Sequence, residues 1–154
     1  MSSSMSTPGE FQALIARSLA LLEREHALAF AALRASLRGQ RLRLEIGAER
    51  FSVTHDADTL RLGAPEGGST VELRTTRQTL LALVEHETSL LEAVLRGRLE
   101  LRGTVPALAR FHDALALYLH GAVRSPSFPA LLPELRHLAA PHLAPAAPPS
   151  QEMP

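Results

Sequence analysis

Histidine and carboxylate side chains are the groups in this chain that could perform proton transfer or hold a metal ion. None of the seven histidines forms the i, i+4 pair with a glutamate that zinc hydrolases use, and the chain has no cysteine. It also has no Gly-x-Ser-x-Gly elbow, no P-loop and no dinucleotide fingerprint. His112, His120 and His137 are interpreted as interior or rim histidines. We therefore expect no metal ion and no cofactor.

Three glutamates are the candidates for a general acid or base, because a pocket that raises the pKa of a carboxyl group makes it useful for proton transfer. They are Glu85, Glu87 and Glu92. Each also fits an ordinary position at an exposed helix end or a helix cap, and we favour that interpretation. A small enzyme that uses one of them or a histidine is the weaker alternative, so no catalytic residue is predicted.

The charge balance argues against nucleic acid as a partner. Sixteen basic residues, all of them arginine, are matched by sixteen acidic ones, and only 4% of the residues are aromatic. A nucleic-acid-binding protein usually carries a basic excess on one face. The N-terminus lacks the features of a signal peptide, and no apolar run is long enough for a transmembrane helix. We expect a cytoplasmic protein without stable membrane insertion.

The chain is rich in leucine at helical and strand spacing. Helices and strands must bring these leucines together in the fold. Thr7-Pro8-Gly9-Glu10 resembles a helix start, and apolar residues recur at helical spacing up to Gly39. The sequence therefore predicts a long N-terminal helix over 8–38, whose length allows a break near Glu25-His26. This helix is expected to pack on the domain or on a second copy of the chain.

From Gln40 the period changes to two, which is typical of strands with one buried face. Four strands are predicted, at 41–46, 50–55, 59–62 and 69–74, with turn residues between them. Successive strands joined this way favour an antiparallel meander. Thr75-Thr76-Arg77-Gln78 then has the form of a capping box and starts a helix of about ten residues.

A fifth strand is predicted between two glycines, Gly97 and Gly103. Ser89 caps a short helix before it, and Thr104 caps a longer helix after it. Gly97 stands where the first of these helices needs a left-handed residue. The predicted fold class is α+β: a five-stranded, mainly antiparallel sheet with helices packed on one face and a long N-terminal helix.

The run Thr88-Ser89-Leu90-Leu91-Glu92-Ala93-Val94-Leu95-Arg96-Gly97-Arg98-Leu99-Glu100-Leu101-Arg102-Gly103 resembles the sterol carrier protein 2 (SCP2) lipid-binding domain, and the resemblance extends over about 42–127. Periodicity cannot distinguish a core leucine from one that lines a cavity. The resemblance implies an apolar cavity between sheet and helices for a fatty acyl, sterol-like or isoprenoid lipid. The residues it implies as lipid-binding are Leu80, Leu83, Val84, Leu91, Leu95, Leu99, Leu101, Phe111, Leu115 and Leu119.

Prolines concentrate after Ser125, but an apolar helical face persists before Pro141. We interpret 126–140 as a lid over the cavity, or else as a segment that completes the core. Its apolar residues are Phe128, Leu131, Leu132, Leu135 and Leu138. The expected organisation is a disordered 1–7, one SCP2-like domain over 8–140 with its core at 40–123, and a Pro-rich tail at 141–154.

Two functions fit these expectations. The first is non-enzymatic binding and transfer of one hydrophobic molecule. The alternative is an accessory protein that presents a lipophilic intermediate to enzymes of a quinone or natural-product pathway. In the second case the N-terminal helix or the Arg-rich sheet face would contact a pathway enzyme.

Overall fold

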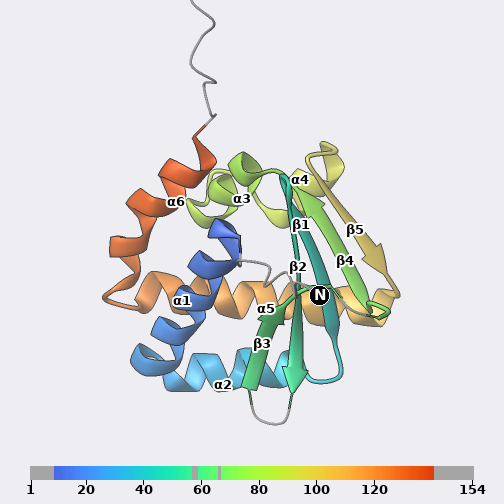
Figure 1. The fold of residues 1–154 in the computed structure, drawn as a ribbon, viewed down its shortest axis with the longest axis horizontal. Coiled ribbons are helices and arrows are strands. Elements are labelled where there is room, and N and C mark those ends of the chain that lie inside the picture. The colour runs from blue at the N-terminus through green and yellow to red at the C-terminus, as the bar shows by residue number, and fades with distance from the viewer. Residues whose placement is uncertain (1–8, 57–58, 66, 141–154) are drawn as a thin grey trace, which may run out of the picture.

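The computed structural model describes residues 9–56, 59–65 and 67–140 (Figure 1). The strands are β1 Arg41–Ile46, β2 Glu49–Asp56, β3 Thr59–Gly63, β4 Val71–Thr75 and β5 Leu99–Gly103. The helices are α1 Glu10–Glu25, α2 Ala27–Ser36, α3 Arg77–Val84, α4 Leu90–Leu95, α5 Val105–Arg124, the 3-10 helix η1 Phe128–Leu131 and α6 Leu132–Ala139. This is the α+β fold with five strands that the sequence predicts.

The sheet has the order β3-β2-β1-β4-β5, and it is antiparallel except where β1 and β4 run parallel. The predicted meander is therefore wrong at its fourth strand, which pairs with β1 and not with β3. The start of β4 is bonded to the start of β1, with the Thr70 N–H 2.9 Å from the Arg41 carbonyl oxygen. The segment between β3 and β4 is long enough to carry the chain past β2 and β1 to the far side of β1. The sequence did not reveal this pairing, because a period of two identifies the buried face of a strand and not the strand beside it.

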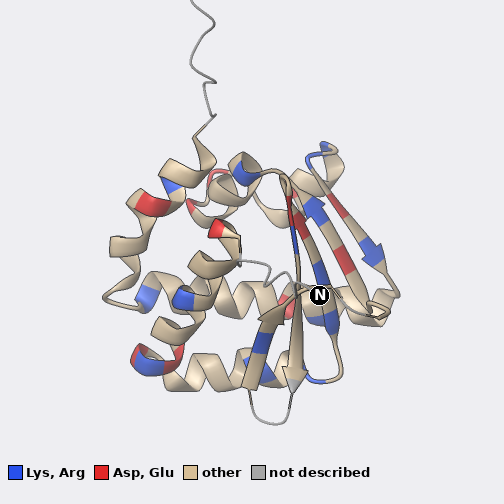
Figure 2. Cartoon of the chain, viewed as in Figure 1, with Lys and Arg blue, Asp and Glu red and all other residues tan. Residues whose placement is uncertain are grey.

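Alternation divides the sheet into an apolar inner face under the helices and a charged outer face. Figure 2 marks the charged positions along the strands. On the inner face Leu42 and Ile46 are buried. On the outer face Glu45 pairs with Arg74 at 2.8 Å and with Arg50 at 3.3 Å. These are the cross-strand ion pairs expected of a wet face, where such pairs contribute little to stability. The pKa of the Glu45 carboxyl group is lowered from its ordinary value, and the largest cause is the hydrogen bond from Arg74.

The N-terminal helical region folds back on the domain. His26 has φ −144° and separates α1 from α2, so the break near Glu25-His26 is confirmed. Phe11, Leu14 and Leu22 of α1 and Phe30 and Leu33 of α2 are buried within this chain, whereas Leu28 of α2 is exposed. Helix α2 lies along α5 (Figure 1). The N-terminal helical region was expected to pack either on the domain or on a second copy of the chain. In the structure its buried apolar residues pack on the domain.

Side-chain caps begin the helices close to where the sequence predicts them. Ser89 accepts from the Glu92 N–H at 3.1 Å, and Thr104 accepts from the Ala107 N–H at 3.3 Å. The cap of α3 is Thr76, one residue later than the predicted capping box implies. The reason is that the preceding threonine still belongs to β4 and is buried there. Thr7 and Pro8, the predicted start of α1, lie outside the described residues.

Helices α3 and α4 end in the same way, with a left-handed residue after the last turn. That residue is Gly97 for α4, with φ +70°, and His86 for α3, with φ +60°. In both, the next backbone N–H bonds to the carbonyl five residues back, at 2.9 Å from Arg98 and 2.8 Å from Glu87. This is the Schellman arrangement, which glycine adopts at least cost.

The two positions make a matched pair for a stability measurement. Gly97→Val should lower the free energy of unfolding by about 1 kcal/mol. Apart from the two neighbours of Gly97 in the sequence, no described residue has a heavy atom within 4 Å of a Cβ placed there, so only the backbone conformation is penalised. His86→Gly should act in the opposite direction. Denaturant titrations would measure both changes. An unchanged midpoint for Gly97→Val would mean that this backbone conformation costs valine nothing.

Candidate ligand cavity

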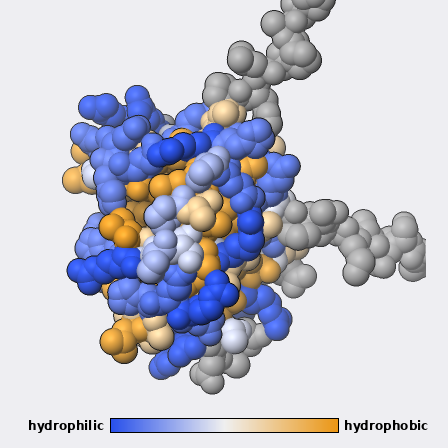
Figure 3. All heavy atoms as spheres, turned by 90° about the vertical axis from the view of Figure 1, so that its left-hand side faces the viewer, coloured by the Kyte–Doolittle hydropathy of each residue, from blue (hydrophilic) through white to orange (hydrophobic). Residues whose placement is uncertain are grey.

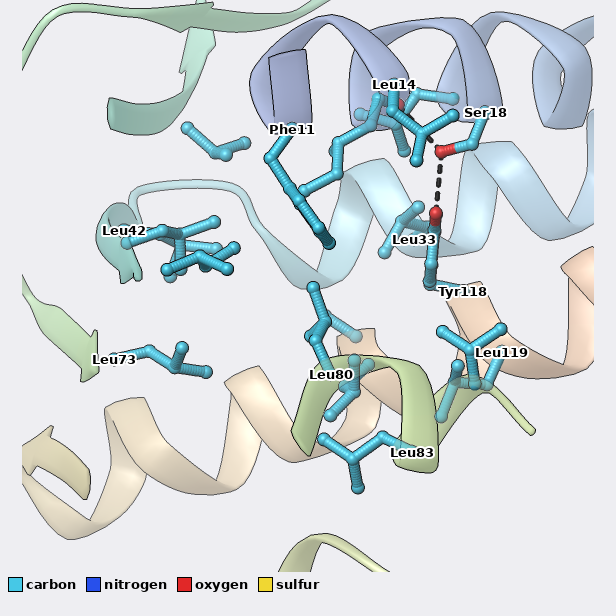
Figure 4. Close-up of a pocket in the computed structure, with 18 of the residues that line it drawn as sticks. Phe11, Leu14, Ser18, Leu33, Leu42, Leu73, Leu80, Leu83, Tyr118 and Leu119 are labelled. Carbon is cyan, nitrogen blue, oxygen red and sulfur yellow. Dashed lines mark hydrogen bonds between the residues drawn. The ribbon is translucent and has the colours of Figure 1, made fainter. Parts of the chain in front are cut away.

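An apolar cavity lies between the inner face of the sheet and the helices (Figure 4). The sheet contributes Leu42, Leu44 and Leu73 to its wall, because these residues alternate inward along β1 and β4. Helices α1, α2, α3 and α5 supply most of the other walls, and η1 and α6 also line the cavity. Of the described residues that line it, all have apolar side chains except Ser18 and Tyr118, which each carry a hydroxyl group.

The cavity has a volume of about 150 Å³. An apolar cavity of about this volume in another protein stays dry and takes up a benzene molecule. The space therefore suits a small apolar group as it stands. A long acyl chain or a sterol needs one of the walls to move outward.

Six of the ten leucine, valine and phenylalanine residues predicted to contact lipid line this cavity. They are Leu80, Leu83, Val84, Phe111, Leu115 and Leu119. The prediction omitted the contribution of α1 and α2, such as Leu14 and Leu33. The family resemblance starts after these helices, so only their helical apolar spacing could have indicated them.

The other four predicted residues lie elsewhere. Leu99 is 2% exposed and Leu101 is partly buried, and both pack in the core beneath β5. Leu91 and Leu95 are 68% and 76% exposed on α4. That helix has only six residues and buries Ala93, which turns both leucines outward. None of these four side chains lines the cavity.

All four residues predicted for the lid line the cavity: Phe128, Leu131, Leu132 and Leu135. Polar contacts tie the segment to the domain. Arg17 of α1 bonds to Glu134, and Arg136 bonds to Glu85 at 2.6 Å. Figure 3 views the side where α1 and α6 lie and shows hydrophobic atoms at the surface between hydrophilic side chains.

A second polar tie anchors the end of α6. The Arg77 guanidinium donates to the Leu138 carbonyl at 3.1 Å and to the Glu49 carboxylate at 2.9 Å. Glu49 also accepts the Phe11 N–H at 2.9 Å and the Gln12 N–H at 3.2 Å, which are free donors of the first turn of α1. One carboxylate from β2 thus connects α1, α3 and, through Arg77, α6.

The two polar side chains at the cavity are Ser18 of α1 and Tyr118 of α5, whose hydroxyl oxygens lie 2.6 Å apart (Figure 4). Ser18 is 4% exposed. Burial raises the pKa of the Tyr118 phenol, and the hydrogen bond to Ser18 offsets only part of this. Tyr118 is therefore uncharged at neutral pH.

No acid or base is directed into the cavity among the described residues that line it. Glu85 pairs with Arg136, and the Glu92 carboxylate accepts from the Thr88 hydroxyl at 3.1 Å. Of the two positions expected for His112, His120 and His137, interior or rim, the interior one is wrong, because all three are exposed. Within the described part of the chain no group of three or more His, Asp or Glu side chains could hold a metal ion.

A surface hollow of about 400 Å³ adjoins this cavity at α3 and α5. Leu83, Leu115 and Leu119 line both spaces. Three leucine side chains are thus common to the cavity and a surface depression.

Of the helices that the structure describes, none has the length and apolarity needed to cross a bilayer.

Several solved structures of sterol carrier protein 2 domains have this arrangement of helices and sheet. A structure titled "UbiJ-SCP2 Ubiquinone synthesis protein" matches with TM-score 0.56 and 18% identity over 77% of this chain and 98% of its own. The sterol carrier protein domain 2 of Helicoverpa armigera matches with TM-score 0.56 and 9% identity over 75% and 96%. Sterol carrier protein 2 from Yarrowia lipolytica matches with a TM-score of 0.51 and 15% identity, over 75% of this chain and 98% of its own.

Comparison with protein-family models gives no match, and comparison with curated proteins gives none either. At identities below a fifth, the likeness to the solved structures is one of fold. It extends over nearly the whole length of each of those domains. The agreement of topology and of the resemblance seen in residues 88–103 leads to one conclusion: this chain has the fold of the sterol carrier protein 2 domains.

Proposed function

We propose that this protein binds one hydrophobic molecule in the cavity between sheet and helices and shields it from water. The observation that carries the proposal is the lining of the cavity, which in the described part of the chain is apolar apart from one pair of hydroxyl groups. Transfer of apolar surface from water into such a site contributes about 25 cal/mol per Å². A lipid can therefore bind there without an ionic contact. The role is one of binding and transfer, not catalysis.

The volume of the cavity requires that a larger ligand displaces part of the wall. Helices η1 and α6 are the candidate for this movement, because they are short and their ties to α1 and α3 include exposed ion pairs. Exposed ion pairs contribute at most about 1 kcal/mol each, so they yield easily. The hollow beside α3 and α5 is the competing route. Here Leu83, Leu115 and Leu119 would move aside.

The direct experiment is extraction of the purified protein with organic solvent, followed by mass spectrometry. A lipid released in a ratio near one per chain would support the proposal and name the ligand class. Protein that carries nothing and takes up no lipid from vesicles would contradict it.

Filling the cavity from within tests the same proposal by mutation. Ala114 lines the cavity and is 2% exposed, so Ala114→Leu should occupy the space of roughly three methylene groups. Binding of an apolar ligand should weaken by about 2 kcal/mol, or roughly thirtyfold. The melting temperature should not fall, because the new atoms fill an empty volume. Isothermal titration would measure the affinity.

The matched control is Ala109→Leu, at an exposed position of the same helix. It changes the sequence in the same way without entering the cavity. Equal affinities for the two variants would show that the ligand does not occupy this space.

A second candidate function is presentation of a lipophilic intermediate to biosynthetic enzymes. It is favoured by the outer sheet face, which among the described residues combines more arginines than glutamates: Arg41, Arg43, Arg50, Arg61, Arg74 and Arg102 with Glu45, Glu72 and Glu100. One structural neighbour is titled a ubiquinone synthesis protein. Genes for quinone or polyketide synthesis beside the gene for this chain would support this function, and genes for fatty-acid catabolism would favour a general carrier.

A further inference from the structure

The hydroxyl pair in the cavity has a definite direction of hydrogen bonding. The Ser18 oxygen lies 2.7 Å from the Ile15 carbonyl oxygen, and a carbonyl can only accept. The single hydrogen of Ser18 is therefore donated to Ile15. It follows that the hydrogen between the two hydroxyl groups, at 2.6 Å, is donated by Tyr118 to Ser18.

This assignment leaves the Tyr118 oxygen with acceptor capacity at the cavity wall. Its own hydrogen is used, and among the described residues no side chain other than Ser18 makes a hydrogen bond with the Tyr118 hydroxyl. A ligand with a hydroxyl group can donate to this oxygen, whereas a hydrocarbon or a ketone cannot.

The surroundings of the pair disfavour a charged ligand. None of the described side chains that line the cavity carries a charge. A carboxylate inside would lose its hydration without gaining a cationic partner, which is costly in an apolar site. Tyr118 would also meet it with the hydroxyl hydrogen already engaged.

We propose that Tyr118 and Ser18 form a polar anchor through which the cavity selects an uncharged lipid that bears a hydroxyl group, an alcohol or a phenol, over a carboxylate. The proposal rests on the proposed function and adds the chemical class of the ligand. The anchor joins α1 to α5, so it also fixes the depth at which the ligand hydroxyl sits. A pair that only joined the two helices would have no influence on which ligand binds.

The test uses probes that match the cavity volume, so that no wall has to move: phenol, toluene and benzoate at neutral pH. The quantity measured by NMR titration is the ratio of the toluene dissociation constant to the phenol dissociation constant. Tyr118→Phe removes the acceptor and should lower this ratio about tenfold, the worth of one hydrogen bond. Toluene binding itself should change little.

Ser18→Ala separates the anchor from a purely structural pair. It frees the Tyr118 hydrogen and keeps the Tyr118 oxygen, so the ratio should stay the same or rise. If the pair only held the two helices together, both variants would loosen the contact between α1 and α5. The binding of phenol and the binding of toluene would then weaken by the same factor. Ser18→Ala also carries the test if Tyr118→Phe does not fold, since a fall in its ratio would overturn the anchor.

The outcomes for the proposed function and for the anchor are distinct. Toluene binding with a ratio unchanged by Tyr118→Phe overturns the anchor alone. Benzoate binding as tightly as phenol overturns it too, because the carboxylate is ionised at neutral pH. Absence of toluene binding to the unmodified protein would overturn the proposed function and the anchor with it.

Discussion

Replacing Glu49 with alanine is expected to lower the free energy of unfolding by about 3 kcal/mol. The side chains of Glu49 and Arg77 are only 13% and 20% exposed, and they lie 2.9 Å apart. Removal of the carboxylate leaves a largely buried guanidinium without its counter-charge. It also takes the acceptor from the first N–H groups of α1, at Phe11 and Gln12. Chemical denaturation would measure the loss.

Glu72→Ala is the matched control for this substitution. Glu72 also pairs with an arginine, at 3.5 Å, but the side chain is 43% exposed on the outer sheet face. Its loss should cost no more than about 1 kcal/mol. Similar costs for the two variants would show that Glu49 is an ordinary surface residue and not the cap of α1.

Deletion of residues 126–154 is expected to remove at least about 5 kcal/mol and to leave little cooperative unfolding. Phe128, Leu135 and Leu138 are each less than 10% exposed, and burial of such a side chain contributes about 1.5 to 3 kcal/mol. The deletion also uncovers the apolar partners of these residues in α1 and α3. The total approaches the stability of a typical domain. Calorimetry on the truncated protein would measure the effect.

A chain that ends at residue 140 is the control, because it keeps 126–140 and lacks only 141–154. Full stability of this control would assign the loss to 126–140. The segment can still act as a movable wall, since local opening needs less energy than loss of the segment. If the deletion variant melted cooperatively and only released ligand faster, 126–140 would be a lid and not part of the core. Equal stability and equal ligand release would contradict both roles.

The sequence by itself determined the features that depend on neighbouring residues. Alternation along β1 revealed its buried face, because successive side chains of a strand point to opposite sides. Ser89 and Thr104 were recognisable as caps because a cap contacts a backbone N–H only three residues away. Gly97 was recognisable as a left-handed residue for the same local reason.

Tertiary structure decided whatever depends on residues far apart in the chain. The partner of β4, the outward turn of Leu91 and Leu95, and the cap of α1 by Glu49 all depend on how elements meet. The bond between Ser18 and Tyr118 joins residues one hundred positions apart. Periodicity describes the face of an element but not which element covers it, and the boundary between core and cavity is drawn only when the faces are packed together.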